Sequence, residues 1–512
     1  MYLVLFLLII LIYFVFRIIT KNHDYWKKRN VPFVKPSLFF GNYSEYILLK
    51  KYLAQVTREI CQKFPKEPYI GSFYGTEPAL IVQDPNILKL VLSTDFAYFS
   101  GREITDYSHS EALTRNIFFN GGGEWKVSRQ VLSPLFTVTK VRDMFPLIKE
   151  CTKEFEEYLE GLVQSKKKIE VESLMARYTM RCIMTCTYDV NAHTLEHNVK
   201  DNPFVTIGEK IFDVSIKRSL KLIFRAMWPS LFYGLGFAMF DEQVSVFFNK
   251  MFKEAYDKRL ASGSTRSDVI DHFLKLKEKK YLICDTFSNL KLEKKITKVE
   301  ANNELFGCQS LSLFAAGYET TSATMTFLLY ELAKNKHAQD RLIEEIDAYL
   351  LKENGVIEYD CVNELPYLEA CIQETLRLYP VLGLLTREAM GKYTLPTGLT
   401  LQKGDRIHIP VYHLHRNPEI FPEPELFRPE RFYGEERKKI NPFSYLPYGN
   451  GPRMCLGIKF AKMPIYAGIL SVFRKYKLEL SEETPLKLNF EAAGLVTHCM
   501  DKIYIKFLYR NS

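Results

Sequence analysis

The sequence has no block of lysine and arginine dense enough for a nucleic-acid surface, although 69 basic and 60 acidic residues leave a net charge of +9. That excess is modest for 512 residues and fits a solvated surface, with docking of an acidic protein partner as a further use. Internal repeats and low-complexity segments are also missing. We therefore expect a globular protein that does not bind nucleic acid.

Paired cysteine and histidine spacing of the kind that binds zinc is missing as well. The ten cysteines are scattered, and although Cys182 and Cys186 could share one helical face, no histidine or second cysteine pair accompanies them. Nine cysteines are interpreted as reduced core or surface residues, which fits a protein that faces the cytosol.

One long apolar run is present, and it lies at the N-terminus. Residues 1–16 are apolar without a break, and Arg17 is followed by two more isoleucines and then by lysines. A bilayer needs roughly 20 apolar residues, and a charge near the end of the run can reach the interface. A cleaved signal peptide would instead carry positive charge before the run and a small-residue site after it. We expect residues 1–20 to be one membrane anchor, with the rest cytosolic.

Most of the remaining chain has the pattern of helices. Residues 150–162 and 301–349 show apolar spacing near 3.6, whereas residues 69–82 alternate and carry two glycines and a proline, which predicts a small β-meander. Residues 215–240 mix four basic residues with bulky apolar ones, as in an amphipathic helix pair or a membrane-contacting surface. The expected fold class is mainly α with small β-sheets.

Cys455 stands in the run LPYGNGPRMCLG (446–457), just ahead of an apolar helical stretch. Backbone N–H groups at a helix start stabilise a thiolate, and the flanking glycines let the backbone approach a flat ligand. Arg453 can meet an anion beside a metal site. An isolated cysteine would more often be a buried structural residue, but this spacing favours a thiolate held against a metal.

The segment resembles the haem-binding loop of the cytochromes P-450, F-x-x-G-x-R-x-C-x-G, with Tyr448 in place of the phenylalanine. In that family the cysteine thiolate is the axial ligand of the iron of haem b and favours O–O cleavage. The resemblance implies the cytochrome P-450 fold and a haem b held by Cys455. Two departures stand out: Tyr448 adds a hydroxyl that needs a partner, and Pro464 is expected to kink the following helix by removing a bond to the carbonyl of Phe460.

A second motif, LFAAGYETTS (313–322), lies within a long apolar helix. A glycine, a carboxylate and hydroxyls are locally unfavourable there, which indicates a packing or functional reason. Small residues such as Ala316 let a planar cofactor lie against the helix, and Thr320 can donate to the carbonyl of Ala316 and loosen a turn. The motif matches the family's A-G-x-[DE]-T, which implies that Glu319 and Thr320 deliver protons during oxygen activation.

A third motif pairs Glu374 with Arg377 on one helix face, and the run FRPERF (427–432) adds Arg431. The resemblance implies a buried structural network of these three residues on the thiolate side of the haem. Alone, the first pair would be an ordinary surface salt bridge.

A fourth motif, W-x-x-x-R, places Trp125 and Arg129 on one face of a helix. In the family these residues bind a haem propionate, and because haem has two propionates, Arg387 and Arg453 are the other candidates. By position in the family, the substrate pocket would be lined by apolar or small residues: Phe118, Ala315, Val381, Leu382, Leu384, Leu495 and Val496.

The resemblance covers residues 25–510 and is closest in wording to microsomal insect members. It implies an anchor (1–20), a basic and proline-containing hinge (21–42) and a haem-thiolate monooxygenase domain (43–512) on the endoplasmic reticulum membrane. No G-x-G-x-x-G loop is present, so NADPH would supply electrons through a separate cytochrome P-450 reductase, with cytochrome b5 as a further partner.

The expected reaction inserts one atom of dioxygen into a lipophilic small molecule, and a xenobiotic, a hormone and a fatty acid all remain open as substrates. One alternative is an isomerase or dehydratase of the same fold that acts on peroxides, but such relatives tend to lose the Glu319 and Thr320 pair. The other is a non-catalytic haem-binding protein, which would not need that pair.

Overall fold

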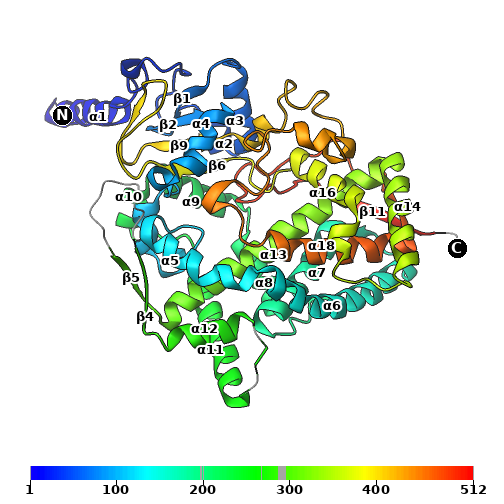
Figure 1. Ribbon diagram of the computed structural model, residues 1–512. Helices are drawn as coiled ribbons and strands as arrows, with labels where there is room; N and C mark the ends of the chain where they lie inside the picture. Colours follow the sequence, from blue (N-terminus) through cyan, green and yellow to red (C-terminus); the bar gives the residue numbers. More distant parts are fainter. Residues whose placement is uncertain are drawn as a thin grey trace.

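The computed structural model describes residues 2–196, 199, 201–263, 265–266, 268–285 and 296–510. The chain is mainly helical with small sheets, as predicted from the sequence. The helices are α1 (Tyr2–Thr20), α2 (Ser44–Ile47), α3 (Leu53–Gln62), α4 (Pro85–Lys89), α5 (Gly122–Leu132), α6 (Val138–Gln164), α7 (Val171–Tyr188), α8 (Pro203–Ile211), α9 (Ile216–Met227), α10 (Pro229–Gly234), α11 (Glu242–Ser262), α12 (Val269–Lys277), α13 (Asn303–Lys334), α14 (Lys336–Lys352), α15 (Cys361–Glu364), α16 (Pro366–Leu378), α17 (Val411–Leu414) and α18 (Ile458–Lys475). The strands are β1 (Tyr69–Tyr74), β2 (Glu77–Val82), β3 (Ile169–Glu170), β4 (Tyr281–Asp285), β5 (Ile296–Glu300), β6 (Leu385–Glu388), β7 (Tyr393–Thr394), β8 (Thr400–Leu401), β9 (Arg406–Ile409), β10 (Tyr476–Leu480) and β11 (Tyr504–Tyr509). The strands β1, β2, β6 and β9 lie at the end from which α1 projects, and the long helices fill the other side (Figure 1).

Helix α13 crosses the helical core and carries the second motif. The side chain of Asn302 caps its start by accepting the N–H of Leu305 at 2.9 Å. Apolar residues surround the helix on all sides, which is why most of it is buried. The helical stretch expected over 301–349 is broken at Asn335, whose backbone leaves the helical region (φ −109°, ψ 81°) and separates α13 from α14.

The predicted meander over residues 69–82 is the hairpin β1–β2, to which β9 adds in parallel and β6 then adds antiparallel to β9. Phe73 and Leu80 pack into one buried cluster, whereas Ile70 and Ile81 pack into another. The alternation in the sequence therefore separates two buried faces of the hairpin. Neither of these faces is the solvent-exposed face that such alternation usually indicates. This sheet places β6, and with it Arg387, against the centre of the molecule.

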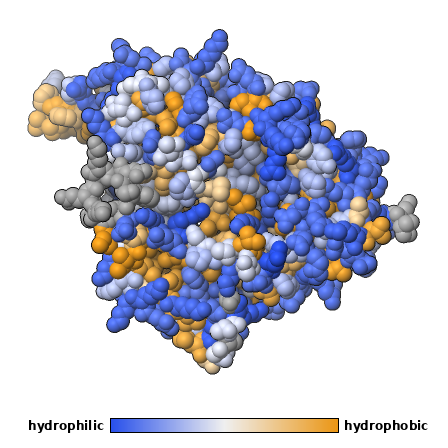
Figure 2. Space-filling model, viewed as in Figure 1, coloured by the Kyte–Doolittle hydropathy of each residue, from blue (hydrophilic) through white to orange (hydrophobic). Residues whose placement is uncertain are grey.

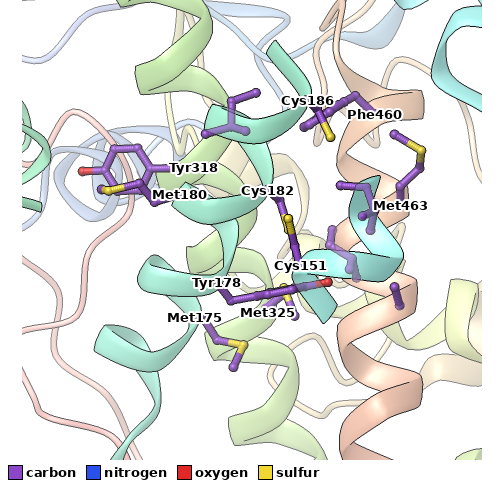
Figure 3. Close-up of a cluster of buried hydrophobic side chains, with 14 of the residues drawn as sticks. Cys151, Met175, Tyr178, Met180, Cys182, Cys186, Tyr318, Met325, Phe460 and Met463 are labelled. Carbon is purple, nitrogen blue, oxygen red and sulfur yellow. The ribbon is translucent and has the colours of Figure 1, made fainter. Parts of the chain in front are cut away.

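Helices α6, α7, α13 and α18 form a core rich in sulfur (Figure 3). Cys151, Cys182 and Cys186 lie among methionine and aromatic side chains there, and all three are free thiols. Buried cysteines in such surroundings behave as small apolar groups, which agrees with the absence of zinc spacing in the sequence. Helix α18 continues through Pro464, whose carbonyl accepts the Tyr178 hydroxyl at 3.2 Å.

Helix α1 projects from the body as an apolar rod (Figures 1 and 2). It has 19 residues, a mean hydropathy of 2.9, and no buried residue. By length and composition it can cross a membrane, as residues 1–20 were expected to do.

The residues after α1 are packed against β1. Trp26 is 1% exposed, and its indole N–H donates to the carbonyl of Ser72 at 2.9 Å. A Cβ at Gly71 would lie 2.4 Å from the Trp26 ring, so only glycine leaves room for it. The N–H of Gly71 also donates to the carbonyl of Pro32 at 2.7 Å. The first part of the expected hinge is therefore packed against β1 and hydrogen-bonded to it.

Helices α9 and α10 occupy the segment expected to be amphipathic. Ile216 and Leu231 are exposed, but two of its basic residues point inward. Arg218 donates to the carbonyl of Met239, and the Nε of Arg225 donates to the Tyr233 hydroxyl at 2.6 Å. The outer face is thus more apolar than the sequence pattern suggested, since only part of the basic charge faces out.

Candidate functional site

The loop before α18 is shaped by glycine. Gly449 and Gly451 both have φ +71°, in the left-handed region. A Cβ at Gly451 would lie 1.8 Å from the carbonyl oxygen of Leu92, so the backbone approaches too closely for a side chain. The N–H of Cys455 donates to the carbonyl of Tyr448 at 2.9 Å, which fixes the cysteine at the end of this loop.

Cys455 differs from the other nine cysteines, which are all buried, because it retains accessible surface. Protein nonetheless surrounds it, and burial raises the pKa of its thiol, while the N–H of Gly457 and the charges of Arg129 and Arg102 act in the opposite direction. Such a thiol borders an interior space and becomes a thiolate once a metal ion binds it. Ala316, in the middle of α13, is exposed in the same way.

Four arginines gather near Cys455 without a carboxylate partner among the described residues: Arg102, Arg129, Arg387 and Arg453. Arg387 and Arg453 are 2% and 5% exposed, and the Nε of each has no hydrogen-bond partner. Burial lowers the pKa of Arg453 well below its usual range, and repulsion by the other three lowers it further. Four cations without a carboxylate partner, two of them buried and two half-buried, fit the two propionates of haem.

The predicted residues Trp125 and Arg129 lie on α5 beside this group. The guanidinium of Arg453 lies 5.0 Å from the centroid of the Trp125 ring, and Arg129 donates to the carbonyl of Met454 at 2.9 Å. Arg453 also donates to the carbonyl of Asn120. The four residues proposed from the sequence for the propionates are therefore brought together.

Arg102 was not found from the sequence. It donates to the carbonyl of Phe118 at 3.0 Å, stacks over that ring at 4.0 Å, and has its pKa lowered to about 10 by burial. It lies in an irregular segment with no spacing that ties it to the W-x-x-x-R motif, so no local signal could have identified it.

The second motif shapes α13 in two ways. The expected hydrogen bond is present: the Thr320 hydroxyl donates to the carbonyl of Ala316 at 2.6 Å. Of the two reasons expected for the glycine, the structure shows a packing one, because a Cβ at Gly317 would lie 2.5 Å from Cδ1 of Ile183 in α7. The glycine lets α13 pack on α7, and it is Ala316 that faces the accessible space.

Glu319 lies on α13 with its side chain 12% exposed. One of its oxygens is 3.8 Å from Nδ1 of His498, and the same nitrogen is 3.1 Å from Glu172. Neither His498 nor Glu172 was predicted, since they lie in distant segments that only the fold brings to α13.

The third motif is a buried network. Glu374 and Arg377 are fully buried and joined at 2.7 and 2.8 Å, and Arg431 reaches the same carboxylate at 3.4 Å. The remaining donors of Arg377 bind the carbonyls of three residues: His415, Pro424 and Leu426. The charge of Glu374 is thus matched by two cations, and the guanidinium of Arg377 is fully hydrogen-bonded.

His415 connects this network to the cysteine loop. Its carbonyl accepts Arg377 at 2.9 Å, and its Nε2 accepts the N–H of Leu446, the first residue of the loop, at 2.8 Å. Burial lowers the pKa of His415 to about 3, so the ring stays neutral and can accept this bond. No motif in the sequence indicated this role.

The predicted pocket residues are half-buried or buried, with one exception. The N–H of Thr497 donates to the carbonyl of Val381 at 2.9 Å, which joins the segment of Val496 to that of Val381. Phe118 lies against Arg102, Ala315 lies one residue before Ala316, and Leu382 and Leu384 are half-buried before β6. Leu495 is 44% exposed.

The hydroxyl of Tyr448 has no hydrogen-bond partner in the part of the chain that the structure describes, and burial raises the pKa of this phenol, as do Glu369 and Cys455. The Tyr448 phenol thus stays neutral within the loop.

Comparison with known proteins shows the family to which the chain belongs. The sequence model of the family described as Cytochrome P450 matches residues 31–507. Among curated proteins, Cytochrome P450 6B1 of Papilio polyxenes is 33% identical over 493 residues, 96% of each chain. Cytochrome P450 6B2 of Helicoverpa armigera is 32% identical and Cytochrome P450 6k1 of Blattella germanica 31% identical, each over 94% of this chain and 93% of its own. With its cysteine loop, its arginine cluster and these relatives, the chain belongs to the cytochrome P-450 family of haem-thiolate monooxygenases.

Proposed function

We propose that Cys455 is the axial ligand of haem b and that the enzyme inserts one oxygen atom into a lipophilic small molecule. The observation that carries the assignment is the accessible Cys455 beside four arginines without carboxylate partners among the described residues, of which Arg387 and Arg453 are buried and Arg102 and Arg129 are half-buried. A protein holds haem through a thiolate ligand to the iron and through cationic side chains that bind the two propionates at the edge of the haem.

Haem, when bound, supplies the iron at which dioxygen is activated. The chain's own residues set its surroundings: Arg102, Arg129, Arg387 and Arg453 bind the propionates, and Gly451 lets the loop approach closely. Arg387 has its pKa lowered to about 9 by burial and by Arg102, so an anion relieves the repulsion in this group.

Thr320 and Glu319 handle protons in this proposal. Because the Thr320 hydroxyl already donates to the carbonyl of Ala316, its oxygen remains free to accept a hydrogen bond from a water in the groove. Glu319, one residue before it, supplies a proton to that water. Both lie one helical turn after Ala316, which is exposed in the middle of α13.

The substrate is proposed as a lipophilic molecule, xenobiotic or endogenous, because the residues proposed to line the pocket are apolar or small. Electrons come from NADPH through a separate cytochrome P-450 reductase, with cytochrome b5 as a further donor. Helix α1 anchors the enzyme in the endoplasmic reticulum membrane, with residues 43–512 as the cytosolic catalytic domain.

The test starts with Cys455→Ser, which we expect to abolish the strongly red-shifted Soret band of the reduced carbon monoxide complex, because sulfur ligation produces that band. Cys284→Ser is the matched control, since the Cys284 thiol donates to the carbonyl of Gly123 at 3.4 Å and a serine hydroxyl can do the same. A normal band in Cys455→Ser would contradict the ligand assignment.

Product formation then separates the possible activities. The wild-type enzyme with reductase and NADPH should oxidise compounds from a lipophilic library. Turnover of hydroperoxides alone, with no product from NADPH, would instead indicate the isomerase or dehydratase, and no turnover of either kind would indicate a haem-binding protein.

A further inference from the structure

A histidine and a second carboxylate lie close to Glu319. Glu172, Glu319 and His498 each present one atom within 4.8 Å of the others. The Nδ1 of His498 is 3.1 Å from Glu172 and 3.8 Å from Glu319, so one nitrogen is shared between two carboxylates.

Three separate parts of the fold converge here. Glu172 lies in the first turn of α7, which packs along α13, where Glu319 is found. His498 belongs to the C-terminal segment that also carries Val496, and its carbonyl accepts the N–H of Glu491 at 2.9 Å. The histidine is thus held by backbone pairing and aimed at α13.

The charges of this trio favour a protonated histidine. Burial lowers the pKa of His498, but Glu319, Glu172 and Glu491 outweigh burial and raise it to about 9. Burial raises the pKa of Glu172 to about 7, with Glu319, Glu170 and Glu491 adding to the rise and His498 opposing it. Near neutral pH the trio therefore holds an imidazolium and a carboxylate that exchanges its proton readily.

Accessibility decreases along the trio. The side chains of His498 and Glu172 are 30% and 26% exposed, and that of Glu319 is 12% exposed. Solvent therefore reaches His498 and Glu172 more readily than Glu319.

We propose that His498, positioned by Glu172, returns protons from solvent to Glu319 after each turnover, an inference that rests on the proposed role of Glu319. In the step, the Nδ1–H bond of the imidazolium breaks and an O–H bond forms on the Glu319 carboxylate. The neutral imidazole then takes a proton from solvent water, and no electrons are exchanged. Because 3.8 Å is longer than a hydrogen bond, one bridging water or a turn of the Glu319 side chain completes the path.

Two variants of the trio test this relay against a matched control. His498→Gln removes the proton donor, and Glu172→Gln keeps the shape but removes the carboxylate that positions it. His193→Gln removes a histidine that is also paired with a glutamate, His193 with Glu196 at 2.6 Å, but on the exposed surface.

The kinetic readouts are NADPH oxidation with saturating substrate, its dependence on pH and its solvent isotope effect. In His498→Gln we expect NADPH oxidation to slow about 10-fold, with a larger isotope effect and a loss that grows as pH rises. Glu172→Gln should move the decline of the rate to a lower pH, because His498 then loses its proton more easily. The control should match the wild type.

A readout independent of turnover is the thermal unfolding midpoint as a function of pH. The folded pKa of His498, about 9, lies above its ordinary value of 6.5, so the protonation of His498 contributes stability in full below pH 6.5 and loses it as pH rises through 9. The midpoint of the wild type should therefore exceed that of His498→Gln at pH 6.5, and the difference should shrink by pH 9.5. A difference that does not change with pH overturns the charged pair.

A purely structural histidine would change the midpoint but not the isotope effect, and a wild-type isotope effect and pH profile in His498→Gln overturn the relay. Thr320→Ala reports on the proposed function separately, because its loss of coupling does not require His498. Uncoupling in Thr320→Ala with no kinetic effect in His498→Gln removes the relay alone.

Discussion

The substitution Glu374→Gln should destabilise the enzyme strongly while changing its shape very little. The carboxylate of Glu374 accepts four N–H groups: two from Arg377 at 2.7 and 2.8 Å, the backbone N–H of Arg428 at 2.8 Å, and Nε of Arg431 at 3.4 Å. Glutamine removes the negative charge and leaves both buried guanidiniums without a counterion. Removing one partner of such a network costs about 3–5 kcal/mol.

This loss in free energy of unfolding corresponds to a modest shift of the thermal unfolding midpoint because the chain is long. At about 2 cal/mol/K per residue, unfolding a chain of this size carries an entropy of about 1 kcal/mol/K, so the midpoint should fall by about 3–5 °C. The assay is differential scanning calorimetry of the haem-loaded enzyme at one fixed scan rate, because large chains often unfold irreversibly.

Glu435→Gln is the matched control. Glu435 and Lys438 have the same i, i+3 spacing and lie 2.7 Å apart, but both side chains are exposed. Solvent screens such a pair, so the midpoint should not move measurably. Equal midpoints for the two variants would refute the reasoning that burial gives the network its weight.

Three further predictions concern the proton path, the anchor and the propionate group. Thr320→Ala should lower the product formed per NADPH and raise the hydrogen peroxide released, while the substrate still shifts the iron spin state. The control Thr324→Ala, which removes a similar bond to the carbonyl of Thr320 at 2.8 Å, should keep wild-type coupling. Wild-type coupling in Thr320→Ala would remove the role of Thr320 in proton delivery. Deletion of residues 2–20 should leave a haem-loaded protein that salt extracts from membranes, and a truncated chain that folds only in detergent would contradict the assignment of α1 as a separate anchor. Arg387→Gln should weaken haem retention by about 1.5–3 kcal/mol, measured as the transfer of haem to a scavenging apoprotein. The surface variant Arg437→Gln should leave haem retention unchanged. Equal transfer rates for the two variants would argue against a propionate at Arg387.

The sequence predicted the parts of the site that lie within one helix turn or one loop. The hydrogen bond from Thr320 to Ala316 and the pairing of Glu374 with Arg377 follow from spacings of four and three residues. A helix places such residues on one face regardless of what surrounds it, so a motif is enough to foresee them.

Contacts between distant segments could not be predicted in this way. Arg102 joins the arginine cluster, His415 supports the cysteine loop and His498 reaches α13, each from a segment without a motif of its own. Gly317 shows the same limit, because its closest neighbour is Ile183 on another helix and not the accessible space. Which face of α13 meets which partner depends on tertiary packing that a single pattern does not encode.

The seating of Trp26 on β1 sets how high the catalytic body can rise above a bilayer. Only five residues lie between Thr20, the last residue of α1, and Trp26 with its buried indole, and this stretch of chain spans at most about 20 Å. With α1 in a membrane, as proposed, this short connection keeps the catalytic body close to the bilayer surface. The body cannot move farther away to meet a partner in solution. An electron donor must therefore come to it within that height, which favours one that is tethered to the same membrane.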